Sequence, residues 1–376
     1  MPTTNLYFGA LASVAFILLW GVSLWNGTVT AMVRAAWVGQ LDGQTALRTS
    51  YTGFFPVDFV LSLLVAFFFY GTNGSHPGFQ LFLVDAYATL QVAFVWLYIE
   101  GSRAQPRSWT LRNPVVFGLL WQGFGAAIAL PLYFMYHLRW QRDWYNNNSN
   151  KNKHTLASPS LEAARALPFA FLLGAVLPAV VGMLPTWYPS RDAQTHQVIL
   201  AVWQLDPIYV SVTQTILVKV QRSPPGPATL SRQRNAAWWV RFCLVLAAGL
   251  SAMAHIYTMV SIAQFPSLGF ASIYVPNLLT GPPDAHHRLA NGPWLFLQYD
   301  LIIITTSCLS WAFCVTEPQL SAGNKWCSRM LLGLGLIAGT VLLGAGSVVS
   351  LVLFFRETSL QQQREAIDEH KRPKRA

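Results

Sequence analysis

The stretch that decides the fold is FQLFLVDAYATLQVAFVWLYIEGSR, residues 79–103, which is apolar and aromatic along most of its length but carries Asp85 and Glu100. About 20 helical residues cross a hydrocarbon core of ~30 Å, so this stretch predicts a transmembrane helix. An Asp at the centre of such a helix costs roughly 2.5 to 3.5 kcal/mol on insertion scales. Acids inside the apolar stretches are therefore the first candidates for functional residues.

The composition extends this prediction to the whole chain. Of its 376 residues, 53% are hydrophobic and only 11% are charged, whereas about 25% are charged in soluble domains. We expect an all-α, polytopic membrane bundle with eight or nine transmembrane helices, forming a single domain over residues 1–355, with a charged C-terminal tail at 356–376. The expected spans lie near residues 7–25, 53–70, 79–100, 114–137, 167–185, 196–218, 242–263, 293–315 and 330–355.

The distribution of charge indicates that the basic residues contact a lipid bilayer and not a nucleic acid. The net charge of +10 resides in loops and in the tail residues Lys371, Arg372, Lys374 and Arg375. Basic flanks of this kind set membrane orientation and attract anionic lipid. The first span has no basic region before it and no small-residue cleavage pattern, so we expect it to be retained rather than removed as a signal peptide.

Two acids have a ready structural explanation at helix N-termini. Asp58 follows Pro56 at the start of the second span, where the positive end of a helix stabilises an acid by about 0.3 to 1 kcal/mol. Asp300 lies early in the span near 293–315, where a weaker form of the same explanation applies. A catalytic role is the alternative for Asp58.

Asp85 and Glu100 share one helix face but are too far apart to act as a pair. At about 100° and 1.5 Å per residue they fall within about 60° of each other and about 22 Å apart along the axis. Both can face one vertical cavity, with Trp96 between them, whereas Tyr87 and Gln91 point away. Either acid is thus a candidate proton donor, and Trp96 is a candidate for lining the substrate path.

Glu100 has a possible partner in Arg103, three residues further along the same helix surface. A simple ion pair is one interpretation of this spacing. The other is that Arg103 binds an acidic group of a ligand at the end of the span.

Asp206 occupies the middle of the span near 196–218, directly before Pro207. Proline removes one helical hydrogen bond and strains the preceding turn, so we expect the helix to kink or open at this acid. Trp203 and Tyr209 lie within a turn of it. An acid at a mid-membrane kink beside aromatic rings is hard to explain by packing, which favours a functional role.

Several familiar chemistries lack their motifs here. The eight histidines are scattered rather than gathered in the boxes that hold two irons, and the spans contain no paired Asp-rich motif for Mg²⁺-diphosphate. Nucleophile-elbow, zinc-protease and phosphate-loop patterns are also absent from the sequence. We therefore expect no cofactor and no metal.

Isolated acids among aromatic side chains suit proton-coupled transport, isomerisation of a sterol or isoprenoid, or acid-initiated carbocation chemistry. In the last case, a protonated carboxyl activates an epoxide or alkene, and aromatic faces stabilise the cation. The aromatic segment from Gln264 to Trp294 is either a lid on the mouth of a cavity or an ordinary interfacial loop.

Three motifs resemble the fungal membrane-bound terpene cyclases of the ascofuranone and ascochlorin type. They are Y-x-G-x-x-x-x-D at Tyr51 to Asp58, the D…E-G-S-R run from Asp85 to Arg103, and W-x-x-D-P from Trp203 to Pro207. The resemblance implies a non-metal cyclase that protonates a prenylated, terminally epoxidised meroterpenoid or sesquiterpenoid substrate. It also implies acidic roles for four residues without selecting the donor: Asp58, Asp85, Glu100 and Asp206.

This resemblance sets the remaining expectations. The substrate is a small isoprenoid molecule, supplied by a prenyltransferase and an epoxidase of the same pathway. The enzyme resides in the endoplasmic reticulum or another endomembrane. Helical facing and the expected kink at Pro207, rather than the resemblance, make Trp96, Trp203 and Tyr209 the expected substrate-binding residues, together with Arg103 as a possible partner of an acidic ligand group.

Overall fold

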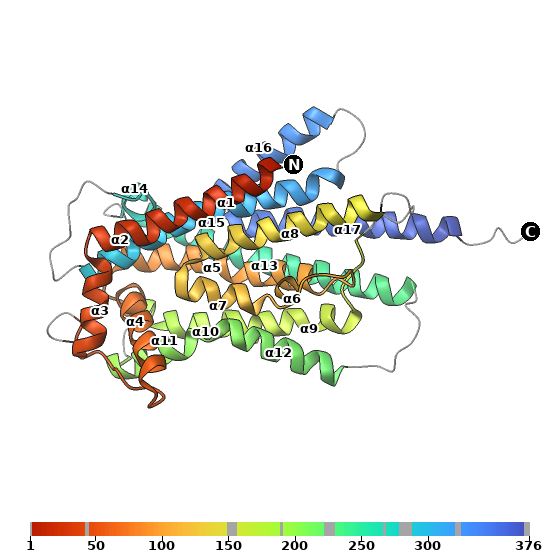
Figure 1. The fold of residues 1–376 in the computed structure, drawn as a ribbon. Coiled ribbons are helices and arrows are strands. Elements are labelled where there is room, and N and C mark those ends of the chain that lie inside the picture. The colour runs from red at the N-terminus through yellow and green to blue at the C-terminus, as the bar shows by residue number, and fades with distance from the viewer. Residues whose placement is uncertain are drawn as a thin grey trace, which may run out of the picture.

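The computed structural model is an all-α bundle, which confirms the expected fold class (Figure 1). It describes residues 2–41, 45–148, 156–188, 191–221, 230–265, 268–277, 288–319 and 325–371. In these ranges the elements are α1 (Pro2–Phe16), η1 (Ile17–Gly21), α2 (Val22–Trp25), α3 (Thr28–Val38), α4 (Phe55–Thr72), α5 (Pro77–Gly101), α6 (Trp109–Arg112), α7 (Val115–Phe124), α8 (Ala126–Asn148), α9 (Leu161–Phe171), η3 (Leu172–Val176), α10 (Leu177–Met183), η4 (Leu184–Thr186), α11 (Ala193–Trp203), α12 (Asp206–Val220), α13 (Leu230–Gln264), α14 (Phe270–Tyr274), α15 (Arg288–Thr316), η5 (Glu317–Gln319), α16 (Lys325–Leu343) and α17 (Ala345–Lys371).

Seven helical segments in the described part of the chain are long and apolar enough to cross a membrane, which makes this an integral membrane protein by length and composition. They are Thr3–Trp25, Phe55–Thr72, Pro77–Gly101, Leu161–Thr186, Leu230–Gln264, Arg288–Gln319 and Trp326–Leu343. The expected spans near 114–137 and 196–218 are not among them, because each is broken into two helices. One break is at Gly125, whose φ of 103° ends α7, and the other is at residues 204–205.

The prediction of one span near 330–355 is wrong. Gly344, with φ of 81°, separates α16 from α17, and the two helices pack against each other as a hairpin. A left-handed φ of this kind is accessible to glycine without steric cost, so the chain can reverse within a single residue. α17 then runs to Lys371, across the expected boundary at 355. As a result, Arg356 and Glu357 are only 2% and 1% exposed.

α5 lies at the centre of the bundle. It packs against α4, α9, α13 and α17 (Figure 1). Within its most apolar 18-residue segment 89% of the residues are buried inside the protein, compared with 6% for the corresponding segment of α16. A helix enclosed in this way cannot turn its polar side chains toward water or lipid headgroups. Each of them must find a partner inside the protein.

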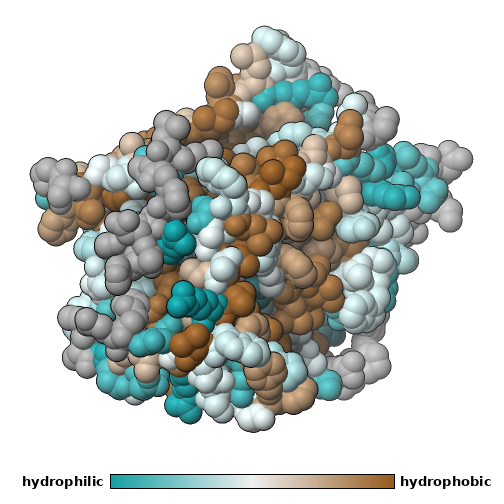
Figure 2. Space-filling view, turned by 60° about the vertical axis from the view of Figure 1, so that its left-hand side comes forward, coloured by the Kyte–Doolittle hydropathy of each residue, from teal (hydrophilic) through white to brown (hydrophobic). Residues whose placement is uncertain are grey.

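The outer surface of the bundle carries many exposed apolar side chains. On α16, for example, Leu331, Leu334, Val341 and Leu342 are all more than half exposed. Figure 2 shows broad hydrophobic areas on one face of the molecule. Exposed apolar surface of this extent on long apolar helices is suited to contact with lipid tails.

Glycines let neighbouring helices approach the start of α12 closely. A Cβ atom on Gly118 of α7 would lie 2.6 Å from the Cβ of Pro207, and one on Gly174 of η3 would lie 2.5 Å from the backbone nitrogen of Val210. Both distances are shorter than real Cβ contacts allow. The position of Asp206 and Pro207 therefore depends on small residues in the helices on either side.

This packing predicts opposite results for two glycines on α7. Gly118→Ala should destabilise the protein by about 1 to 3 kcal/mol, because the added methyl overlaps the rigid Pro207 ring. Gly123→Ala should be neutral or slightly stabilising, because nothing lies within 4 Å of its added Cβ. Thermal unfolding of the detergent-solubilised proteins measures both, and equal midpoints would contradict the close approach.

Candidate functional site

Asp206 lies where the helix opens, as the Asp-Pro sequence predicted. α11 ends at Trp203, and α12 begins at Asp206. Because Pro207 has no N–H group, the carbonyl of Trp203, four residues earlier, has no helical donor. The Asp206 side chain is held in the interior at this break, with the residue only 1% exposed.

Two uncharged side chains hold the Asp206 carboxyl. Gln91 Nε2 donates to Oδ2 at 2.8 Å, and Gln122 Nε2 donates to Oδ1 at 2.8 Å. No cation pairs with this carboxyl in the described part of the chain. Its surroundings therefore compensate a negative charge only weakly, which favours the protonated form of a buried acid.

Aromatic rings pack beside this acid. The ring of Trp203 lies 4.7 Å from that of Tyr87 and 5.8 Å from that of Phe68, measured between centroids. The half-buried Tyr209 lies three residues beyond Asp206 on α12. The buried Trp203 Nε1 has no hydrogen-bond partner in the described structure. We call Tyr87, Gln91, Gln122, Trp203 and Asp206 the acid–aromatic cluster.

Asp300 caps a helix, but not the one we expected. Its own helix, α15, begins much earlier, at Arg288, so Asp300 lies well inside it. Its Oδ1 accepts a hydrogen bond of 2.8 Å from the backbone N–H of Ala127, in the first turn of α8. The break at Gly125 creates that helix N-terminus within the bundle, and the acid satisfies one of its free N–H groups.

Asp58 has the structural environment of a first-turn acid. It lies near the start of α4 and accepts hydrogen bonds from the backbone N–H of Thr52 at 2.7 Å, from the Thr52 hydroxyl at 2.8 Å and from the N–H of Gly53 at 3.0 Å. Three donors stabilise the ionised carboxylate. This arrangement anchors the segment that precedes α4.

Asp85 is paired with a histidine that sequence reasoning did not connect to it. His255 Nδ1 on α13 lies 3.0 Å from both carboxylate oxygens, and its Nε2 lies 3.2 Å from the carbonyl oxygen of Val341. Both ring nitrogens face acceptors, which favours the doubly protonated imidazolium. The Tyr274 hydroxyl also donates to Asp85 Oδ2, at 2.6 Å.

This tyrosine belongs to the segment between 264 and 294 that we expected to be either a lid or an interfacial loop. The structure describes residues 268–277 of it but not 266–267 or 278–287. Within the described part Ile273 is fully buried, and Gln298 Nε2 donates to its carbonyl oxygen at 2.6 Å. Residues 268–277 are therefore anchored to both α5 and α15.

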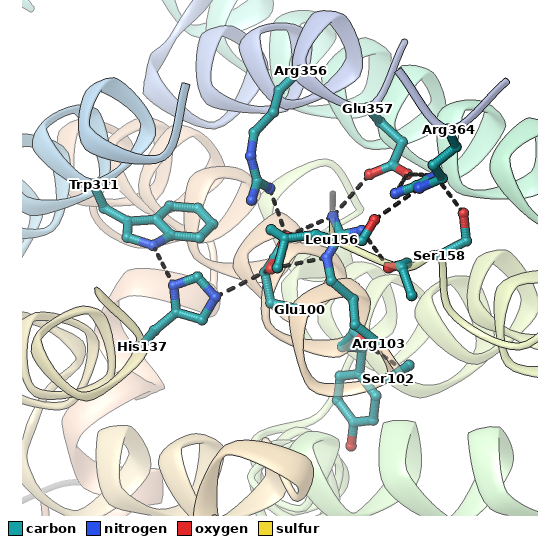
Figure 3. A network of polar contacts seen from close by, with 12 residues as sticks. Glu100, Ser102, Arg103, His137, Leu156, Ser158, Trp311, Arg356, Glu357 and Arg364 are labelled. Atoms are coloured by element: carbon teal, nitrogen blue, oxygen red, sulfur yellow. Dashed lines mark hydrogen bonds and ion pairs between the residues drawn. The ribbon is translucent and has the colours of Figure 1, made fainter. Parts of the chain in front are cut away.

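Glu100 lies in a buried ion-pair network, and the ion pair with Arg103 that the sequence offered is present (Figure 3). Arg103 bonds to Glu100 Oε1 and to Glu357 Oε2, both at 2.8 Å, and Arg356 Nη1 bonds to Glu100 Oε1 at 2.7 Å. Glu357 is bonded in turn to Arg364, at 3.1 Å. Two guanidinium groups on one carboxylate hold Glu100 in the ionised form.

His137 completes the network from α8. The Nε1–H of Trp311 donates to His137 Nδ1 at 3.2 Å, so the other ring nitrogen, Nε2, carries the proton and donates to Glu100 Oε2 at 3.1 Å. The imidazole is thus neutral, and it lies between Trp311 and Glu100 (Figure 3). Trp96 lies between Glu100 and Asp85 as expected, but its ring is fully buried and its Nε1 donates to Ser350 at 2.9 Å. The helix face between the two acids is packed.

The partners of the acids were harder to predict than the acids. Sequence reasoning missed Gln91, Gln122, His255, Arg356 and Glu357 as functional or structural partners. The signal for Gln91 and Gln122 was present, because each is an uncharged polar residue within a long apolar stretch. In the described ranges no group of three His, Cys, Asp or Glu side chains is arranged to hold a metal ion.

Breaking the network around Glu100 should destabilise the protein strongly. Glu100→Gln leaves the buried Arg356 without its bonded carboxylate and leaves Arg103 with Glu357 alone, which costs about 3 to 5 kcal/mol for a buried pair. Glu317→Gln is the matched control, because its ion pair with Arg329 is exposed and such pairs contribute about 0 to 1 kcal/mol. Unfolding in detergent compares the two, and similar losses would contradict this assignment.

Comparisons with known proteins agree with the resemblance seen in the sequence. The chain is 26% identical to the terpene cyclase DEP1 of Alternaria brassicicola, with 96% of this chain and 100% of that protein aligned. It is 24% identical to the terpene cyclase ctvD of Aspergillus terreus, over 83% and 87% of the two chains, and 25% identical to the terpene cyclase ascI of Acremonium egyptiacum, over 72% and 69%. No solved structure matches. The CtvD-domain family model matches residues 4–360, and the chain belongs to this family.

Proposed function

We propose that this protein is a membrane-bound terpene cyclase that closes a ring in a prenyl chain by protonating it from Asp206. Relatives named terpene cyclases align over most of the chain, which supports the reaction class. The observation that carries the choice of acid is the set of partners around Asp206. A proton donor must hold its proton until the substrate takes it.

The five intramembrane acids differ in whether they can meet that requirement. Glu100 is bonded to two guanidinium groups, and Asp85 is bonded to the His255 ring and the Tyr274 hydroxyl, so both have partners that stabilise a negative charge. Asp58 accepts three hydrogen bonds, two of them from backbone N–H groups, and Asp300 is bonded to the N-terminus of α8. Asp206 alone among the five has only neutral amide donors from side chains.

The chemistry follows from the position of this proton. Asp206 transfers it to the terminal epoxide oxygen of the prenyl chain, the C–O bond opens, and the electron pair of a neighbouring alkene forms the new C–C bond. The faces of Trp203 and Tyr87 stabilise the resulting cation through their negative quadrupoles. Loss of a proton from carbon then gives the cyclic alkene. Gln91 and Gln122 fix the carboxyl in place throughout.

The substrate, its supply and the membrane that holds the enzyme belong to the same proposal. The substrate is a terminally epoxidised meroterpenoid or sesquiterpenoid that enters from the bilayer, because the helices around Asp206 present apolar surfaces to lipid. A prenyltransferase must supply the chain and an epoxidising enzyme the strained ring. An apolar substrate of this kind partitions into a bilayer, and we propose that the enzyme resides in the endoplasmic reticulum or a related membrane. Asp85 and its partners act by positioning helices.

Asp206→Asn tests the donor. It should lower the cyclisation rate by about 10²- to 10⁴-fold, the usual contribution of a general acid. The fold should persist, because the Asn oxygen can still accept from Gln122 and the Gln91 amide can turn so that its unused Oε1 accepts from the new NH₂ group. Product formation from an epoxidised farnesyl phenol in microsomes, identified by mass spectrometry and NMR, is the measurement.

Asp300→Asn is the matched control inside the bundle. Its side-chain oxygen can still accept the hydrogen bond from Ala127, so activity should stay within about threefold of wild type. Full activity in Asp206→Asn, or equal losses in the two variants, would rule out Asp206 as the donor.

Trp203 tests the stabilisation of the cation. Trp203→Phe keeps an aromatic face beside Tyr87, whereas Trp203→Leu removes it. A cation–π contact contributes about 0.5 to 2 kcal/mol, so the Leu variant should be about 2- to 30-fold slower than wild type, and the Phe variant should lie between them. Comparing kcat at equal expression, together with the proportion of uncyclised diol, separates this role from a packing defect, which would slow both variants alike.

A further inference from the structure

A second cluster contains an arginine, Arg107, that bonds to no carboxylate among the described residues. Arg107 follows α5 in the chain, and its guanidinium lies 4.0 Å from the centre of the Trp140 ring. All three of its guanidinium nitrogens are shielded from solvent, and none has a hydrogen-bond partner among the described residues. Burial lowers the pKa of Arg107 to about 10. A guanidinium in this position lacks the anion that normally accompanies it.

Two further groups next to Arg107 have unused donors. Arg356 bonds to Glu100 through Nη1, but its buried Nε and Nη2 have no partner in the described structure. The hydroxyl of Tyr133 is also buried without a partner, and its ring stacks on His137 at 5.8 Å. The Trp140 ring under Arg107 lies 5.8 Å from the His137 ring, and His137 in turn stacks on Tyr133 and bonds to Glu100, the partner of Arg356.

The charges of this region do not balance. It holds four arginines and two glutamates: Arg103, Arg107, Arg356, Arg364, Glu100 and Glu357. The described region therefore carries an excess of two positive charges, since His137 is neutral. Both glutamates are already bonded to other arginines, so neither is available to Arg107. A bound anion would remove this imbalance.

We infer that Arg107, Arg356 and Tyr133 form a binding site for an oxyanion carried at the end of an apolar chain. We call these three residues the arginine site. Guanidinium groups present paired N–H donors that match a carboxylate, phenolate or phosphate, and a tyrosine hydroxyl adds a third donor. The ligand is therefore the acidic head group of the substrate or the phosphate of an anionic lipid. These sources share one chemistry and are separated by experiment.

The position of the site relative to Asp206 suits the substrate. Gln91, which holds Asp206, and Glu100, which holds Arg356, are both on α5, nine residues and about 14 Å apart along the helix axis. A linear isoprenoid could place its acidic head at the arginine site and its far end at the acid–aromatic cluster. This extension rests on the proposed function, whereas anion binding itself does not.

Binding measurements without turnover test the site independently of cyclisation. The full chain is placed in nanodiscs of a zwitterionic lipid and titrated with a farnesylated dihydroxybenzoic acid or with its methyl ester, which lacks the carboxylate. We expect the acid to bind at least tenfold more tightly than the ester. Arg107→Gln should abolish this preference, and the exposed Arg112→Gln on α6 should retain it.

Tyr133→Phe and nanodiscs of anionic lipid provide two further tests of anion binding. Tyr133→Phe removes one hydroxyl with little change in packing and should reduce the preference for the acid by about threefold, which covers the case in which Arg107→Gln fails to fold. Nanodiscs with net-negative lipid test the other source, because a lipid phosphate in the site would raise the unfolding temperature of wild type but not of Arg107→Gln. If neither the acid preference nor the lipid effect depends on Arg107 or Tyr133, the site does not exist.

Discussion

The enclosure of α5 is the constraint on which the rest of the structure depends. A helix surrounded by protein must satisfy its polar side chains within the protein, and α5 carries Asp85, Gln91 and Glu100 at three different heights. Each of the three side chains bonds to a residue of a different helix. His255 of α13 meets Asp85, Asp206 of α12 meets Gln91, and α17 brings Arg356 to Glu100. The helix hairpin at Gly344 positions Arg356, and the helix break before Pro207 positions Asp206.

The same constraint separates the acids by their chemistry. Where the partner is a cation, as at Glu100, the carboxylate is fixed as an ion and the pair holds helices together. Where the partners are amides, as at Asp206, the charge is not compensated and the proton is retained more readily. A bundle of this type can thus keep one acid reactive among several structural ones. Under our proposal that difference, rather than a cofactor, selects the site of catalysis.

Sequence patterns predicted local features well. Pro207 predicted the opening of the helix at Asp206, and the spacing of Glu100 and Arg103 predicted their ion pair. Patterns failed where a distant partner decides the outcome. We expected Arg356 and Glu357 to belong to a charged tail, because charge normally ends a membrane span, and only their pairing with Glu100 and Arg103 explains their burial. Asp300 likewise caps α8, a helix far from it in the sequence, and the residues around Asp300 do not predict this contact.

The sequence by itself determined that the protein lies in a membrane, that its fold is all-α and which acids lie in the apolar stretches. These properties depend only on the length and hydropathy of local segments, which decide whether a segment can cross a bilayer. It also showed that Asp206 precedes a proline in an apolar stretch. Only the tertiary structure decided which acids have cations beside them, since His255, Arg356 and Gln122 come from parts of the chain far from Asp85, Glu100 and Asp206. Protonation depends on these neighbours, and neighbours are fixed by packing rather than by order along the chain.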